Sequence, residues 1–148
     1  MIFFDAHSGE LFAGDVAGVC LQDADYVRPP TPPPDIDLEA WSDSIQLVKS
    51  LRPDVLYIAH YGAIKSIDEH FDRLHEKLYS WGEFVLVAMR DGKNEAQIVT
   101  MLTEQMNAEL MRVSSSAHIM ERYEIATNYQ MTVQGLMRYW RKKHPERL

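Results

Sequence analysis

Cysteine is nearly missing from this sequence of 148 residues, in which Cys20 stands alone. A single cysteine permits no internal disulfide and no cysteine-rich zinc module, so the composition fits a reducing compartment and we predict a cytoplasmic location. Long apolar runs are missing too, and no charged and then apolar leader opens the sequence. We therefore expect a soluble protein with no membrane partner.

Several common catalytic and ligand-binding patterns are also missing. The sequence has neither a glycine-rich phosphate loop nor a Ser/His/Asp arrangement, and it contains no internal repeat. Cys20 has no evident base partner, which favours a buried structural thiol over a nucleophile.

The length and the 46% hydrophobic content are those of one globular domain, which can bury about two thirds of its unfolded surface. Charge is uneven: residues 1–111 carry 8 basic and 19 acidic side chains, whereas residues 112–148 carry 7 basic and 3 acidic ones. The acidic body would repel nucleic acids and anionic membranes, which argues against a nucleic-acid partner.

Apolar periodicity predicts an α/β protein. We expect a hairpin of short strands at residues 2–4 and 11–13, with both sheet faces covered because neither strand alternates cleanly. The proline-rich residues 28–34 predict an extended loop. Further expected elements are a helix at residues 38–51, a buried strand at 55–59, a long helix from 66 with an apolar seam, a helix at 95–112, a linker at 114–116 and a last helix at 132–143.

Two short apolar runs each deliver a side chain that can bind metal. Asp15 follows Leu11 to Gly14, and His60 follows the run that begins at Val55. Small residues follow both, so the backbone can turn and leave a carboxylate and an imidazole at the ends of adjacent strands. This pattern predicts a metal site at one edge of the sheet.

In their order and context, these two motifs resemble those of the metallo-β-lactamase superfamily. The stretch Leu11 to Gly18 looks like the bridging-aspartate motif of that superfamily, and Ile58 to Gly62 looks like its last-histidine motif. The proline loop and Gly135 to Trp140 look like a bacterial branch of these hydrolases with a helical tail. The resemblance implies half of an αββα sandwich at residues 1–90 and a helical C-terminal extension at 91–148.

The resemblance also implies a site and a chemistry. Asp15 and His60 would be ligands of one or two zinc ions, with Asp15 bridging them, and Tyr61 would orient a small-molecule substrate or stabilise an oxyanion. A metal-activated hydroxide would attack an ester, thioester, lactone or phosphoester. The family's His-x-His-x-Asp-His motif is absent from the sequence, so we expect a C-terminal fragment that is inactive or nearly inactive by itself.

Other residues that could serve such a site have simpler explanations. His70 and His75 point about 140° apart on one helix and cannot share a metal, and His118 with Glu121 lacks a second copy, so all four are expected on the solvated surface. His7 is expected to be exposed at the hairpin turn. The methionines of the C-terminal half are expected to fill the core.

Two alternatives to the hydrolase remain open. The chain could be a metal-free interaction module whose apolar seam, Ile67 to Val85, is covered by a second copy or by a missing N-terminal half of the sandwich. The basic segment Arg138 to Lys143 could instead bind nucleic acid, although cations at the end of a helix more often complement its dipole.

Overall fold

The computed structural model describes residues 1–21, 24–60, 62–114 and 116–148, with backbone only at residues 60 and 117. Its fold is mixed α/β, with a five-stranded sheet followed by a mainly helical region. The chain divides into two compact units. The sheet unit comprises Met1–Pro29 and Leu38–Leu78, and the helical unit comprises Pro30–Asp37 and Tyr79–Leu148.

The sheet unit opens with the predicted hairpin. Strand β1 (Phe3–Asp5) pairs antiparallel with β2 (Glu10–Cys20), so that Phe3 lies opposite Phe12. The predicted return strand at residues 11–13 was too short, because β2 continues to Cys20. Gly14 and Gly18, at φ +56° and +73°, let the strand bulge where the sequence suggested that it ends.

The remaining strands extend this sheet on both sides of β2. Strand β4 (Val55–His60) runs parallel to β2, and the very short β3 (Val27–Arg28) and β5 (Ala63–Ile64) pair antiparallel with β2 and β4. The sequence predicted that β4 ends at His60, which is confirmed. It missed β3 and β5, since two residues are too few for any periodicity, and Arg28 therefore belongs to a strand and not to the proline loop.

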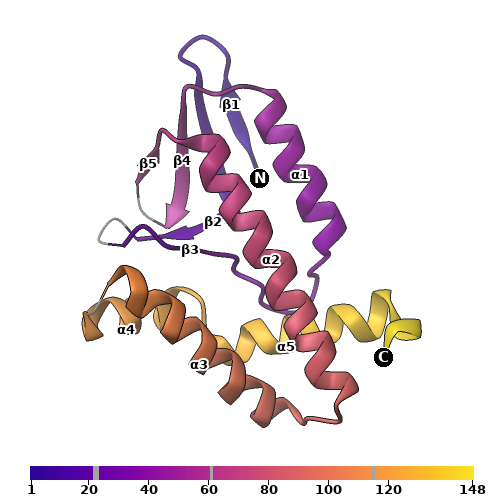
Figure 1. Cartoon of the computed structure of the whole chain (residues 1–148). Coiled ribbons are helices and arrows are strands. Elements are labelled where there is room, and N and C mark those ends of the chain that lie inside the picture. Colours follow the sequence, from indigo (N-terminus) through magenta and orange to yellow (C-terminus); the bar gives the residue numbers. More distant parts are fainter. Residues whose placement is uncertain (22–23, 61, 115) are drawn as a thin grey trace. The chain divides into compact units, whose positions relative to one another are not determined.

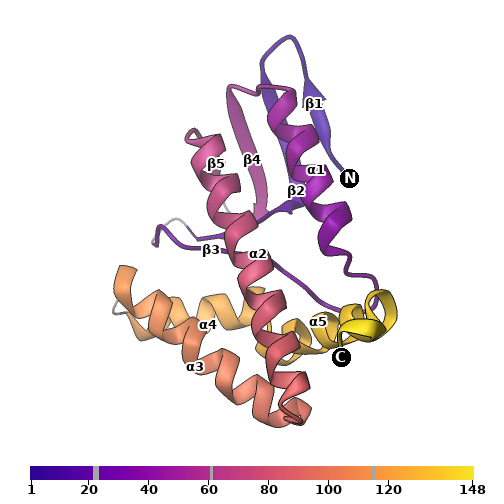
Figure 2. The same ribbon diagram turned by 45° about the vertical axis from the view of Figure 1, so that its right-hand side comes forward.

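Two helices cover one face of the sheet. Helix α1 (Leu38–Ser50) and the first half of α2 (Ile67–Arg90) run along the same side of the sheet in both views (Figures 1 and 2). They enclose one apolar core, formed by Leu11, Ala13, Ala17, Val27, Ile45, Val48, Leu56, Ile58, Ile67, Phe71 and Leu74. The predicted seam of α2 is buried along its whole length.

The opposite face of the sheet is open within this unit, which contradicts the expectation of two covered faces. Phe3 is 63% exposed and Phe12 is 46% exposed, whereas Leu11 and Ala13, on either side of Phe12 in β2, are buried. The ring of Tyr57 stacks on Phe12 with centroids 4.8 Å apart. This alternation along β2 is that of a sheet with a single packed face.

The helical unit contains the second half of α2 and helices α3 (Glu95–Val113), α4 (Ala117–Ala126) and α5 (Tyr129–Lys143), followed by the short 3₁₀ turn η1 (Pro145–Arg147). Gly92, at φ +72°, follows the last turn of α2 and ends the helix. Asn94 caps α3 with a capping box. Helix α3 packs against α5, and the indole N–H of Trp140 donates to the carbonyl of Gly82 at 2.8 Å.

Three expectations for this unit were wrong. Helix α4 was missed, because its buried residues Ile119 and Tyr123 follow a serine-rich linker and make little of an apolar stripe. Helix α5 begins at Tyr129 and not at residue 132. Three methionines that were expected in the core are exposed, namely Met101 at 37%, Met111 at 55% and Met131 at 45%, and the buried stripe of α3 follows Ile98, Leu102, Met106 and Leu110 instead.

Candidate metal site

Asp15 lies within β2, in the stretch where the strand departs from regular pairing. It follows Gly14, whose positive φ redirects the backbone, and its side chain is exposed. The prediction that Asp15 ends its strand was wrong, because β2 continues for several residues beyond it. The bulged strand nevertheless agrees with a functional site, since bulges often re-aim a side chain beside one.

His60 is the last residue of β4, the strand that pairs in parallel with β2. Gly14 lies opposite Ile58, and Val19 lies opposite His60. Asp15 therefore directly follows the residue that pairs with Ile58, and His60 belongs to the next pair of residues along the two strands. Tyr61, the residue expected to orient a substrate, lies outside the described residues.

The donor types at these two positions suit zinc, but they fill only part of a site. Carboxylate oxygen and imidazole nitrogen are both common zinc ligands, and a catalytic zinc site usually has three protein ligands. Among the described side chains, which do not include that of His60, no group of three histidine, cysteine, aspartate or glutamate residues could hold a metal ion.

A polar cleft of about 370 Å³ opens between the end of β2, β5 and the first turn of α2. Its polar lining consists of Cys20, Asp25, Lys65, Ser66, Glu69, His70 and Arg73. The guanidinium of Arg73 lies 2.8 Å from the Asp25 carboxylate and 3.9 Å from that of Glu69. The hydrogen bond from Arg73 lowers the pKa of Asp25, so this pair is charged near neutral pH.

Cys20 borders this cleft as a thiol and not as a thiolate. Desolvation raises its pKa, and the half-buried Sγ lies 3.9 Å from the carbonyl oxygen of Ala24. Because a thiol is a weak nucleophile, these surroundings agree with the structural role expected from the sequence.

His70 is the clearest departure from the sequence-based expectations about histidines. It was expected in solvent, but it is only 2% exposed, and its Nε2 donates to the carbonyl of Ala17 at 2.7 Å. Burial lowers the pKa of His70, while the Ala17 hydrogen bond and Asp25 oppose that effect and Arg73 adds to it. Position 70 lies between Ile67, Phe71 and Leu74 on the buried stripe of α2, a signal available in the sequence.

The other histidines differ in their surroundings. His75 is half-buried and its Nε2 lies 3.0 Å from the hydroxyl of Ser42, so the expectation of a solvated residue was wrong there as well. His7, His118 and Glu121 are exposed, as predicted.

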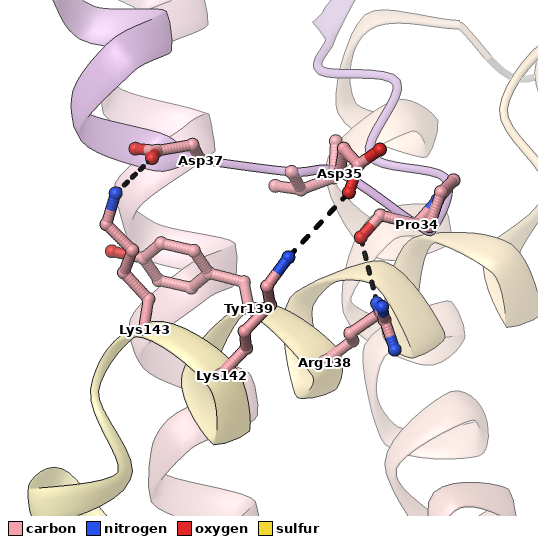
Figure 3. Close-up of a pocket in the computed structure, with 8 residues that line it drawn as sticks. Pro34, Asp35, Asp37, Arg138, Tyr139, Lys142 and Lys143 are labelled. Carbon is pink, nitrogen blue, oxygen red and sulfur yellow. Dashed lines mark hydrogen bonds and ion pairs between the residues drawn. The ribbon is translucent and has the colours of Figure 1, made fainter.

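The basic end of α5 lies against acidic residues of the same unit. Figure 3 shows Lys142 directed toward Asp35 and Lys143 toward Asp37, with Tyr139 between these pairs. The Arg138 Nε donates to the carbonyl of Pro34 at 2.9 Å. These contacts border a cleft of about 190 Å³ and engage Arg138, Lys142 and Lys143 with acceptors of the same unit.

Comparisons with known proteins found no similar protein. No family model matches the chain, and neither a curated protein nor a solved structure matches it. None of the helices in the described ranges is both long enough and apolar enough to cross a membrane.

Proposed function

We propose that this chain supplies Asp15 and His60 to the zinc centre of a hydrolase with the metallo-β-lactamase fold. The observation that carries the proposal is the parallel pairing of β2 and β4, in which Gly14 lies opposite Ile58 and Val19 lies opposite His60. Asp15 directly follows the residue paired with Ile58, and His60 lies two residues after Ile58 on β4, so the backbones of the two motif residues are on adjacent strands. The half-sandwich relationship and the cytoplasmic location belong to the same proposal.

The chemistry expected of such a centre is hydrolytic. Zinc supplies Lewis acidity, which polarises carbonyl and phosphoryl oxygens and makes water a stronger nucleophile, so esters, thioesters, lactones and phosphoesters are candidate substrates. Asp15 would hold the cation through a carboxylate that has two oxygens to offer, and His60 would hold it through an imidazole nitrogen. Two ligands are fewer than the three of most catalytic sites, so we expect little or no turnover from this chain alone.

Zinc binding tests the proposal directly. The wild-type chain is expected to bind zinc in equilibrium dialysis, and Asp15→Ala or His60→Ala is expected to weaken binding roughly 100-fold, on the basis of about 3 kcal/mol for each ligand of a structural zinc site. Asp43→Ala on α1 and His118→Ala on α4 are matched controls, since both remove an exposed side chain of the same type. Absence of zinc from the wild-type chain, or equal binding by all four variants, would refute the site.

A second candidate function is that of a metal-free interaction module, and the open face of the sheet favours it. Phe3 and Phe12 expose aromatic surface there, and Tyr57 extends the same cluster. The α2 seam, which the sequence suggested for this role, is buried and therefore does not support it. Exposed aromatic patches of this kind often mark contact surfaces.

Sedimentation velocity distinguishes this candidate. If the aromatic face joins two copies, the wild-type chain sediments as a dimer at micromolar concentration and Phe12→Ser shifts it to monomer, because the central ring of the cluster is lost. Leu47→Ser, which removes an exposed apolar side chain from α1, is the control and should leave the dimer intact. A monomer at every concentration would count against self-association through this face.

A further inference from the structure

The stretch of β2 that carries Asp15 has more residues than its partner strand can pair. Between the rungs at Gly14 and Val19, β2 contains residues 15–18, whereas β4 contains only Ala59 between Ile58 and His60. Gly14 and Gly18 have positive φ angles at the two ends of this stretch. Since β4 cannot pair with every backbone group of the stretch, other partners are needed to fix its path.

Two side chains from the covering helices supply such partners. The indole Nε1 of Trp41 on α1 donates to the carbonyl of Val16 at 2.8 Å, and the Nε2 of His70 on α2 donates to the carbonyl of Ala17 at 2.7 Å. The two acceptors are consecutive carbonyls, directly after Asp15. A carbonyl can only accept, so the hydrogen bond requires the proton of the imidazole to be on Nε2.

Burial makes these hydrogen bonds decisive for the local conformation. Ala17 is fully buried and His70 almost fully buried, so water cannot replace the bond between them. A buried carbonyl left without a partner costs about 1–3 kcal/mol, which disfavours any path of the stretch that breaks the bond between His70 and Ala17. The bond between Trp41 and Val16 is only partly buried and adds a weaker restraint on the preceding residue. The direction in which the backbone presents Asp15 is thereby restricted from two sides.

We propose that Trp41 and His70 are positioning residues, which hold the Val16 and Ala17 carbonyls and so aim the Asp15 carboxylate at the zinc centre. The inference rests on the proposed function for the identity of the group that is aimed. The two hydrogen bonds restrain residues 15–18 of β2 whether or not a metal ion is bound.

The test uses variants that remove or restore single donors in the full chain. Trp41→Phe keeps an aromatic ring without the N–H, His70→Leu removes the donor, and His70→Gln returns an N–H near the position of Nε2. Trp140→Phe is the matched control, because it removes an indole N–H that also donates to a backbone carbonyl at 2.8 Å, that of Gly82 in the helical unit. Urea unfolding of each variant shows whether it is folded under the assay conditions.

Two readouts are needed. In the metal-free chain, backbone amide exchange over residues 15–19 is expected to become roughly tenfold faster in Trp41→Phe and His70→Leu, and to stay near wild type in His70→Gln and Trp140→Phe. Zinc affinity is expected to fall roughly tenfold in the same two variants and to recover in His70→Gln. A purely structural role would not move zinc affinity in a chain that remains folded, nor the absorption bands of bound Co²⁺ used as a zinc substitute.

The outcomes separate the inference from the proposed function. Zinc binding by the wild-type chain with unchanged affinity in Trp41→Phe and His70→Leu overturns the positioning role and leaves the metal site standing. Absence of zinc from the wild-type chain overturns the proposed function and the aiming of Asp15, and the exchange rates then decide whether the two donors hold the stretch. If His70→Leu does not fold, Trp41→Phe and His70→Gln still decide the matter.

Discussion

Replacing Gly135 with alanine is expected to lower the free energy of unfolding by about 3 kcal/mol, although alanine is the better helix former. Gly135 lies in the interior of α5, where alanine is favoured over glycine by about 1 kcal/mol. A Cβ there would lie 2.0 Å from the Thr31 carbonyl oxygen and 3.2 Å from the Pro32 carbonyl carbon. Because the obstacle is backbone, it cannot rotate away, and the overlap outweighs the gain in propensity.

Urea denaturation followed by tryptophan fluorescence measures this effect, since Trp81 and Trp140 are buried in the same unit. Gly92→Ala is the comparison variant: its positive φ brings strain of about 1–2 kcal/mol, but a new Cβ would meet nothing within 4 Å. A Gly135→Ala chain at least as stable as wild type would mean that residues 31–32 do not lie against α5.

The second large effect is expected at Gly18, on the stretch of β2 that carries Asp15. Its φ of +73° costs an alanine about 1–2 kcal/mol. The added Cβ would also lie 2.8 Å from the Arg28 carbonyl oxygen and 2.8 Å from a Leu74 methyl carbon. The Leu74 methyl can move, but Arg28 is fixed by the pairing of β3 with β2. We therefore expect a total loss of about 3 kcal/mol.

Gly14→Ala separates the two causes of this loss. Gly14 has a similar φ of +56°, but the nearest atom to its added Cβ is the Met1 carbonyl oxygen at 3.3 Å. Unfolding in urea should therefore show a clearly larger loss for Gly18→Ala than for Gly14→Ala. Equal losses would mean that the contact with β3 contributes nothing and that only the backbone conformation matters.

The parts of the fold that were predicted correctly have a strong and local signal. The seam of α2 repeats apolar residues over several turns, and all six of its members, from Ile67 to Val85, are buried. The end of β4 at His60 follows from one continuous apolar run. The parts that were missed lack such a signal: among the described side chains of α4 only two are buried and mark a stripe, and β3 and β5 are too short to have a period.

For the candidate site too, one part could be predicted from the sequence and another could not. The sequence indicated that the strands bearing Asp15 and His60 are neighbours, and the parallel pairing of β2 with β4 confirms that adjacency. The roles of Trp41 and His70 could not be predicted, because their acceptors arise from a bulge that appears only when β2 and β4 are paired. The small residues after Asp15 were interpreted as a turn at the end of a strand, whereas Gly14 and Gly18 allow the strand to continue with extra residues.

The anomalous scattering of zinc in crystals of this chain tests the central claim most directly. The account predicts a zinc ion about 2.0–2.2 Å from a carboxylate oxygen of Asp15 and from an imidazole nitrogen of His60. Zinc bound elsewhere, or these two side chains on opposite faces of the sheet, would contradict it.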